Sequence, residues 1–381
     1  EILSLAGAVI YIFSPYRATD IFIRGAIGEI LAFVFPPLIA LAIVRIIKTK
    51  SIRWIAILSF SSAGLLMSHN IMAYMFFPVL GLLALILIFA DKVPRLHTFL
   101  KVFSGFILGL LISIYFWLPA IVESTLMKYD TVFNFKDHFP TIKQLITPFF
   151  GYGASVAGPY DGMSFFIGVA NLLLVVTGIV LFVKKKLPIV AWALLSFFTA
   201  IFMMNHRSSF IWDNIPFLPY FQFPWRFLSL VTFVTPIFII VLDKFKYAKH
   251  VGLVIILGAI VLNFKYFRPA EFLGRQDAYY LNRYIPQQTI SEEYLKTSEE
   301  YLRLPKATKM RPDRISSAVG KMGTSFESDF NEETTFSYEK YFFPGWEARV
   351  DGKKVDVKAG EPYGQIRFII PAGRHMVEIT F

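Results

Sequence analysis

The sequence predicts an α-helical protein that crosses a membrane many times and carries a separate outer domain at its C-terminal end. Of the 381 residues, 55% are hydrophobic and 17% aromatic, which exceeds the usual content of a soluble domain. The long apolar runs all lie before residue 268, and beyond it the charged residues are dense. A soluble cytosolic enzyme is therefore excluded. The absence of cysteine also excludes disulfides, thiolate metal sites and a cysteine nucleophile.

Apolar runs of the length that a bilayer-spanning helix needs recur along the first part of the chain. After an opening run at 2–13 they lie at about 30–47, 54–68, 71–89, 98–119, 164–183, 187–204, 227–242 and 251–267. The sequence thus predicts about nine spans in the domain 1–267. Because the chain begins at Glu1 inside an apolar run and ends at Phe381 inside an expected strand, we expect a fragment shortened at both ends.

The positive charge is confined to every second connection between these runs. The connections at 45–53, 91–101, 184–186 and 243–249 hold thirteen Lys and Arg against two acids, which accounts for the whole net charge of +11. The positive-inside rule places these four connections in the cytoplasm and the protein in the plasma (inner) membrane. Because the charge forms no single basic stripe, a nucleic-acid partner is excluded.

The other connections then lie together on the outer face. They are residues 14–29, the turn at 69–70, the loops 120–163 and 205–226, and the tail 268–381. The tail balances 17 bases with 17 acids and is long enough for a core of its own. We expect it to be partly helical at about 269–308 and then antiparallel β, as a sheet or sandwich.

Alternating apolar and polar residues predict the strands of this tail. The alternation runs through 326–330, 366–370 and 377–381, and Asp351-Gly352 predicts a hairpin turn between 346–350 and 354–357. Trp346, Tyr341 and Tyr363 are candidate stacking platforms for a sugar or a partner, although an ordinary aromatic core is the favoured interpretation.

The densest group of chemically active residues lies at 14–29, where we expect an interfacial helix that begins near Pro15. On such a helix Tyr16, Asp20 and Arg24 share one face at spacing i, i+4, i+8, and Arg17 lies one turn from Asp20. Planar guanidinium groups suit the phosphate of a lipid head group, so Arg17 and Arg24 are candidate ligands for it.

Two interpretations of this group stay open. Glu29 and Asp20 are candidate bases, and Glu29 also suits an orienting role for Arg24. The structural alternative is that the pairs Asp20–Arg24 and Arg24–Glu29 only anchor the helix at the membrane surface.

The remaining outer connections supply further candidate residues. His69 and Asn70 form an outer turn, where they suit either a ligand or a helix cap. The loop 120–163 carries aromatic and glycine-rich segments with Tyr152 as a candidate sugar contact and Asp161 as a candidate base. The loop 205–226 adds the candidate binding residues His206, Arg207 and Arg226.

The sequence lacks the common signals of several enzyme classes. Its six histidines show no HxxxH or HExxH spacing, so no metal site is predicted. P-loop, GxSxG and GxGxxG signals are also absent. Chemistry on a membrane lipid is the enzymatic option that remains.

Several of these segments resemble a known family. The runs SPYRATDIFIRGAIGE at 14–29, SHN at 68–70, FFGYG at 149–153 and DGMSF at 161–165 resemble bacterial polytopic proteins that carry a "6-pyruvoyl-tetrahydropterin synthase-related domain, membrane protein". The tail segments FPGWEARVDG at 343–352 and PAGRHMVE at 371–378 resemble the outer β-domain of YfhO-like membrane proteins, thought to be GT-C-type glycosyltransferases.

The resemblance implies a GT-C-like fold and a polyprenyl-phosphate sugar as the donor, with a divalent metal as an optional cofactor. It also implies that the main catalytic carboxylate of such enzymes lies upstream of Glu1. Pterin synthesis is not expected, because that chemistry uses a three-histidine zinc site and the histidine spacing here does not provide one.

Three functions follow as hypotheses. The first is a membrane glycosyltransferase of GT-C type that moves a sugar from a polyprenyl-phosphate donor to an acceptor outside the cytoplasm. The second is a transporter or flippase of lipid-linked glycans. The third is a scaffold in envelope assembly without catalytic activity. The sugar and the acceptor are not specified by the sequence.

Overall fold

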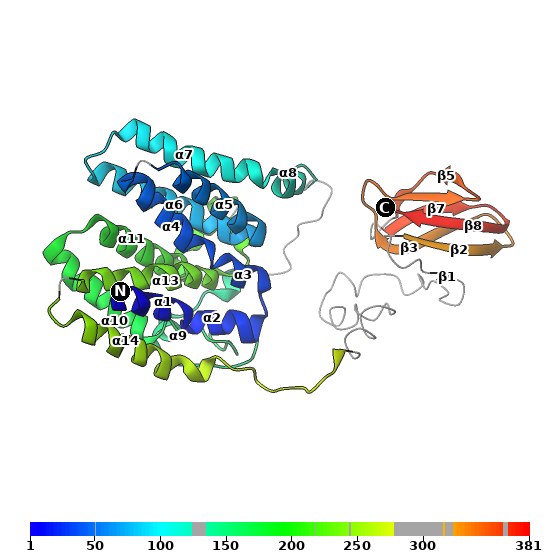
Figure 1. Ribbon diagram of the computed structural model, residues 1–381. Coiled ribbons are helices and arrows are strands. Elements are labelled where there is room, and N and C mark those ends of the chain that lie inside the picture. The colour runs from blue at the N-terminus through cyan, green and yellow to red at the C-terminus, as the bar shows by residue number, and fades with distance from the viewer. Residues whose placement is uncertain are drawn as a thin grey trace. The chain divides into compact units, whose positions relative to one another are not determined.

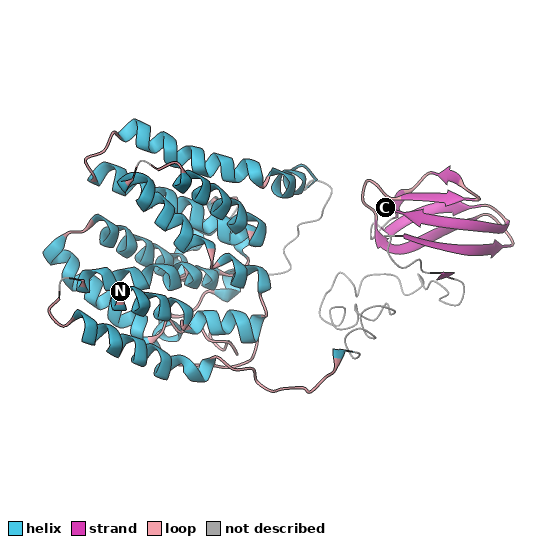
Figure 2. Cartoon of the chain, in the orientation of Figure 1, coloured by secondary structure: helices cyan, strands magenta, loops and turns pink. Residues whose placement is uncertain are grey.

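The computed structural model describes residues 1–49, 51–123, 135–216, 218–243, 245–277, 315–316, 323–360 and 365–381. The chain divides into two compact units, Glu1–Phe272 and Leu273–Phe381. Helices build the first unit and strands build the second (Figures 1 and 2).

The long helices of the first unit follow the apolar runs of the sequence. They are α1 (Ile2–Ile12), α4 (Phe35–Lys48), α5 (Arg53–Ser68), α6 (Asn70–Ala90), α7 (Arg95–Ile112), α10 (Val169–Lys185), α11 (Pro188–Met203) and α14 (Ala248–Asn263). By length and apolar composition, four described helical segments can cross a membrane, or six if each of two bent pairs counts as one span. Three shorter apolar helices complete the set. The protein is therefore a helical membrane protein, and the expected count of nine spans stays a prediction.

Shorter helical elements connect and terminate the long ones. They are α2 (Pro15–Thr19), the π-helical turn η1 (Asp20–Arg24), α3 (Ile27–Ala32), α8 (Ile114–Val122), η3 (Phe135–His138), α9 (Ile142–Ile146), η4 (His206–Ser208), α12 (Ser209–Asn214), η5 (Leu218–Phe221), η6 (Pro224–Phe227), α13 (Leu228–Val234), η7 (Thr235–Leu242) and η8 (Phe264–Tyr266). The expected uninterrupted helix at 227–242 changes from α13 into the 3₁₀ helix η7 at Thr235–Pro236. Proline has no amide hydrogen for the α-helical ladder, which explains the change.

Helix α13 is the most buried element of the first unit. All seven of its residues are buried. Its Thr232 shares a hydrogen bond of 3.1 Å with Ser14, the residue before α2. The helix thus ties the segment 14–29 to the centre of the bundle.

Small residues bring α5 and α7 into close contact. Gly105 and Gly109 on α7 face Leu58, Ser59 and Ser62 on α5, and a Cβ atom on Gly109 would lie 2.8 Å from the Ser59 carbonyl oxygen. The spacing is that of a GxxxG motif, which lets two membrane helices approach closely.

The strands of the second unit form two antiparallel sheets that share one core. One sheet has the order β1-β2-β8-β4-β5 and the other β3-β7-β6. The strands are β1 (Ile315–Ser316), β2 (Gly323–Phe330), β3 (Thr334–Tyr341), β4 (Glu347–Val350), β5 (Lys353–Val355), β6 (Lys358–Gly360), β7 (Gln365–Ile370) and β8 (Gly373–Thr380). Buried residues of both sheets, among them Ala348, Ile366 and Ile379, meet in a single cluster, so the unit is a sandwich.

The alternation in the sequence predicted these strands correctly. Phe326, Phe368 and Val377 point into the core, and β4 and β5 pair across the Asp351-Gly352 turn. Both turn residues have positive φ, 50° and 77°, as a two-residue hairpin turn requires.

Of the three aromatic residues proposed as stacking platforms, the structure describes the side chain of Trp346. Trp346 is half-buried and lies 5.2 Å from the Phe381 ring and 6.0 Å from the Tyr338 ring, centroid to centroid. Tyr363 and the side chain of Tyr341 lie outside the described residues, as does most of the expected helical part at 269–308. Trp346 therefore belongs to the edge of the aromatic core.

A histidine joins two turns of the sandwich. Nδ1 of His375 lies 2.6 Å from Oδ2 of Asp351, and Nε2 lies 3.1 Å from the Ala372 carbonyl oxygen. Neither partner has a proton to donate when the carboxyl is ionised, so both ring nitrogens must carry one. The hydrogen bond to Asp351 raises the pKa of His375 and holds the pKa of Asp351 below its usual value.

Gly109→Ala is expected to destabilise the packing of α5 against α7. The added methyl group would meet the backbone carbonyl of Ser59, and overpacking of this kind costs about 1 to 3 kcal/mol. The measurement is the denaturant midpoint in detergent. Gly81→Ala in α6 is the matched control, since a Cβ atom there meets nothing within 4 Å. Equal midpoints for the two variants would contradict the predicted contact.

The pairing of His375 with Asp351 should make the sandwich lose stability as the pH rises. Because the pKa of His375 is raised, its contribution is complete below the unfolded value of about 6.5 and is lost as the pH passes the folded pKa. The Met376 amide, which donates to Oδ1 of Asp351 at 2.8 Å, should then exchange faster with solvent.

Hydrogen exchange of β8 in the full chain, corrected for the intrinsic rate, measures this effect. His375→Gln should remove the pH dependence, and the exposed His97→Gln should keep it. A native profile that is flat from about pH 6 to about pH 9 would show that the pair does not stabilise the fold.

Candidate functional site

The structure brings together four residues of the segment 14–29 in a buried network. Arg24 forms ion pairs with Asp20 and, at 2.7 Å, with Glu29. The same nitrogen, Nη1, donates to the Tyr16 hydroxyl at 3.2 Å, and that hydroxyl donates to Oε1 of Glu29 at 2.7 Å. Asp20 and Glu29 are fully buried, and Tyr16 is 1% exposed. We call these residues the Arg24 network.

Local sequence explains how the network forms. Pro15 stands at the first position of α2, where proline needs no hydrogen-bond partner. The chain then tightens into the π-helical turn at Asp20–Arg24, a feature often found at functional sites. Gly25 ends this turn with φ 58°, the left-handed conformation that glycine adopts without strain. This reversal turns the chain into α3, which carries Glu29.

A residue far along the chain completes the network. Ser229 on α13 donates to Oε1 of Glu29 at 3.1 Å. Ser229 is not among the residues predicted from the sequence. A signal for it exists: Ser229, Thr232 and Thr235 recur every three residues in an otherwise apolar run and place a polar stripe on one helix face.

Charge balance makes the network tolerable inside an apolar bundle. An isolated buried ion is very costly, so buried charges are paired. Arg24 neutralises one of its two carboxylates, and the field of Arg226 also reaches Glu29. One acceptor nevertheless has no partner among the described residues, namely Oδ2 of Asp20. Donors that reach this oxygen would satisfy the one remaining acceptor of the network.

Arg17 occupies a different environment from Arg24. Its guanidinium lies 4.8 Å from the centroid of the Phe33 ring and 5.3 Å from that of Tyr11. It is half-buried, and no carboxylate of the described residues lies within ion-pair distance of it. Arg17 therefore carries a charge that no described carboxylate pairs with.

Arg226 lies beside the network on η6. Its Nη1 donates to the Phe221 carbonyl oxygen at 3.0 Å, and its guanidinium lies 5.5 Å from the Phe223 ring centroid. Its buried Nε has no hydrogen-bond partner among the described residues. Like Arg17, it can still accept an anionic ligand.

His69 also lies close to the network. Its Nδ1 accepts a hydrogen bond from the Met72 amide at 3.2 Å and so caps α6. Burial lowers the pKa of His69, which keeps the ring neutral at pH 7. A Cβ atom on Gly28 would lie 3.5 Å from this ring, which shows how closely α3 approaches the turn. Asn70 is exposed, and its Oδ1 accepts from the Ile71 amide at 2.8 Å.

An indole ring forms one wall of the network. Arg24 lies 4.7 Å from the Trp225 ring centroid, and Phe165 and Phe223 stack nearly parallel to the same ring at 5.6 and 4.8 Å. Trp225 is 2% exposed. Cation–π contact is strongest for tryptophan and for desolvated cations, so this wall stabilises the buried arginine.

The candidate residues of the long outer loop have structural partners. Asp161 accepts from Ser155 Oγ and Gln144 Nε2, both at 2.8 Å, and from the Val156 amide at 3.0 Å. The Tyr152 hydroxyl donates to the Arg268 carbonyl oxygen at 2.8 Å. These bonds fix the loop, and the proposed roles of Tyr152 and Asp161 toward a substrate stay predictions.

The candidates His206 and Arg207 do not reach the network in this structure. Both are exposed on the 3₁₀ turn η4. The Arg207 amide donates to the side chain of Asn205 at 3.1 Å. Their binding roles stay predictions.

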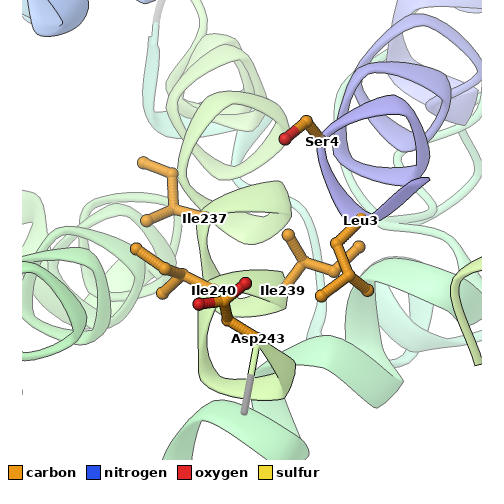
Figure 3. Close-up of a pocket in the computed structure, with 6 residues that line it drawn as sticks. All are labelled: Leu3, Ser4, Ile237, Ile239, Ile240 and Asp243. Atoms are coloured by element: carbon orange, nitrogen blue, oxygen red, sulfur yellow. The ribbon is translucent and has the colours of Figure 1, made fainter. Parts of the chain in front are cut away.

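A cavity of about 250 Å³ lies between α1 and η7, away from all these residues. Figure 3 shows Leu3 and Ser4 on one side of it and the residues of η7 with Asp243 on the other. Its walls are mostly isoleucine and leucine. None of the predicted site residues lines it, so we do not assign the chemistry to this cavity.

The described part of the chain has no cluster of side chains that could bind a metal ion. No group of three or more His, Asp or Glu side chains there is close enough to share an ion. The three-histidine zinc site of pterin synthase chemistry therefore has no counterpart among these residues.

Comparison with known protein families identifies the family of the first unit. Residues 1–268 match the family described as "6-pyruvoyl-tetrahydropterin synthase related domain; membrane protein". No curated protein and no solved structure matches the chain. The matched region contains the complete Arg24 network.

Arg24→Met is expected to destabilise the protein far more than Arg17→Met. The first substitution leaves two buried carboxylates without their cation, a change that costs about 3 to 5 kcal/mol. The second removes only the contacts with two rings, worth about 0.5 to 1 kcal/mol at a half-buried site.

Unfolding of the two variants in the same detergent provides the comparison. Both replace a guanidinium by an unbranched apolar chain in the same helical segment, so they are matched in composition. Similar midpoints would mean that Arg24 is not the cation on which the fold depends.

Proposed function

The chain belongs to the family of 6-pyruvoyl-tetrahydropterin synthase related membrane-protein domains, and from this premise we propose that it is a membrane glycosyltransferase of GT-C type. It would transfer a sugar from a polyprenyl-phosphate donor to an acceptor outside the cytoplasm. The observation that carries the proposal is the Asp20 carboxylate, which Arg24 holds through one oxygen while the other oxygen has no partner among the described residues.

The proposed reaction is a displacement at the anomeric carbon. The bond from this carbon to the donor phosphate oxygen breaks, and that oxygen keeps the electron pair. The acceptor hydroxyl forms the new bond to the carbon and gives its proton to a carboxylate. Asp20 suits this last role, because Oδ2 is an acceptor whose position Arg24 already fixes.

The arginines then divide into two groups. Arg24 is committed to Asp20 and Glu29 and serves to hold the carboxylates. Arg17 and Arg226 are half-buried arginines with no carboxylate partner among the described ion pairs, so we assign the leaving phosphate to them. His69, neutral and close to the network, is a further hydrogen-bond donor for the same ligand.

The orientation of the charges supports an outer-face site. With the four basic connections in the cytoplasm, the segment 14–29, the turn at His69 and the loops 120–163 and 205–226 lie on the other side. The structure brings Arg24 of the segment 14–29 and Ser155 of the loop 120–163 into contact with Trp225 of the loop 205–226. In this orientation the sandwich domain is extracytoplasmic and the membrane is the plasma (inner) membrane.

One observation favours a second function, the transport of lipid-linked glycans. Asp20, Arg24 and Glu29 lie inside helical segments that qualify as parts of membrane spans. Ionisable residues inside spans commonly line the paths of transported substrates. A transporter would move the lipid-linked sugar between leaflets and leave its glycosidic bond intact.

Arg17→Ala is expected to reduce transfer at least tenfold while the protein still inserts and folds, because it removes a phosphate ligand and leaves the network intact. The measurement is consumption of labelled polyprenyl-phosphate sugars by membranes that contain the protein, with and without a divalent cation. Asp20→Asn should lose the reaction as well, and Arg53→Ala, at an exposed arginine outside the candidate site, is the control.

The outcomes separate the two functions. Consumption that depends on Arg17 and Asp20 supports transfer. Full activity in both variants removes these roles. Movement of intact donor between leaflets of a vesicle, without cleavage, would replace the transferase by the transporter.

A further inference from the structure

The hydroxyl of Ser155 occupies a junction between the long outer loop and the Arg24 network. It donates to Oδ1 of Asp161 at 2.8 Å. Trp225 Nε1 donates to it at 3.2 Å, and the Nδ1 atom of His138 lies 3.0 Å away. Because a hydroxyl has a single proton, which Asp161 accepts, Ser155 receives its other hydrogen bonds as an acceptor.

The turn that carries Ser155 is held firmly. Gln144 Nε2 donates both to Asp161 at 2.8 Å and to the Pro159 carbonyl oxygen at 3.2 Å. The Gly153 amide donates to the Gly162 carbonyl oxygen and the Gly162 amide to the Ala154 carbonyl oxygen, and a Cβ atom on Gly162 would lie 2.6 Å from Gly153 Cα. The position of the Ser155 hydroxyl is thus set by the loop and not by Trp225.

The Trp225 indole ring contacts both Ser155 and Arg24. Stacking against Phe165 and Phe223 fixes the plane of the Trp225 ring, but stacked rings can still rotate within that plane. The hydrogen bond from Nε1 to Ser155 removes this freedom. The Arg24 guanidinium lies 4.7 Å from the centroid of the ring that this bond holds in place.

We propose that Ser155 is a positioning residue, which orients Trp225 beneath Arg24 and so fixes how this arginine divides its bonds between Asp20 and Glu29. The turn at 151–162 then belongs to the site, although none of its side chains is required to touch the substrate. This inference rests on the proposed function only for its activity measurement.

The first test uses 5-fluorotryptophan and ¹⁹F NMR on the full chain. The chain has six tryptophans, and Trp225→Phe identifies the resonance of Trp225. Ser155→Ala should shift this resonance, and Ser155→Thr, which keeps a hydroxyl, should restore it. Ser209→Ala, the same change at a serine bonded to the His206 carbonyl, is the matched control and should leave it unchanged.

The second test asks whether the bond positions the arginine. Arg24→Lys should move the Trp225 resonance in the native background and move it less in the Ser155→Ala background. An unchanged resonance in Ser155→Ala, or an equal effect of Arg24→Lys in both backgrounds, would overturn the inference, with no reference to activity.

The third test measures turnover of the labelled donor. Ser155→Ala should lower kcat roughly fivefold to tenfold at constant KM, because misplacement of a catalytic shell lowers the rate more than the affinity. Trp225→Phe probes the same bond from the other end, and the double variant should be no worse than the poorer single one. Additive losses would show two independent effects and overturn the inference.

The tests also separate this inference from the proposed function. Native protein that consumes no donor, together with the expected NMR shifts, would remove the transferase activity and keep the positioning role. Normal turnover in Ser155→Ala would keep the transferase and remove the positioning role.

Discussion

The structure of the first unit depends on one guanidinium group shared by two buried carboxylates. An apolar bundle can hold Asp20 and Glu29 only if a cation and several donors accompany them. Arg24 supplies the cation, and Tyr16 and Ser229 supply the donors. The requirement dictates the local backbone, since the π-helical turn and the left-handed Gly25 bring Arg24 and Glu29 to the same point. It also draws α13 toward α3.

How far the sequence predicts this arrangement depends on how local each contact is. The spacing of Tyr16, Asp20 and Arg24 on a helix that begins near Pro15 predicts their shared face, and the structure has these contacts. The same is true of the sandwich strands, because alternation over a few residues decides which side chains point inward. The polar stripe of α13 marks Ser229 but not its partner Glu29, which lies 200 residues away, and no local pattern marks the contact between Ser155 and Trp225, 70 residues apart. The number of membrane spans is likewise not encoded locally, since two candidate spans are pairs of helices bent near Ser14 and near His206.

The loop and the segment 14–29 are coupled through aromatic side chains and few charges. Trp225 touches Arg24 with its face and Ser155 with its edge, so one rigid ring joins a polar loop to a buried ion pair. Thr19 adds a second bond to the loop, with its hydroxyl 3.4 Å from the Ser164 carbonyl oxygen. Because two independent contacts join the same pair of segments, their relative position is better defined than either contact alone would make it.

The strength of the Arg24 network limits what it can do with a ligand. Removing a buried ionic partner costs about 3 to 5 kcal/mol of stability. The free energy of unfolding of a typical domain is only about 5 to 15 kcal/mol. A ligand that withdrew Arg24 from its carboxylates would therefore destabilise the folded protein as it bound. An anionic head group therefore has to bind cations other than Arg24. Arg17 and Arg226 are half-buried and have no acid partner among the described ion pairs. This separation, with one arginine for the fold and two for the ligand, is the reason to assign binding to Arg17 and Arg226 and proton transfer to Asp20.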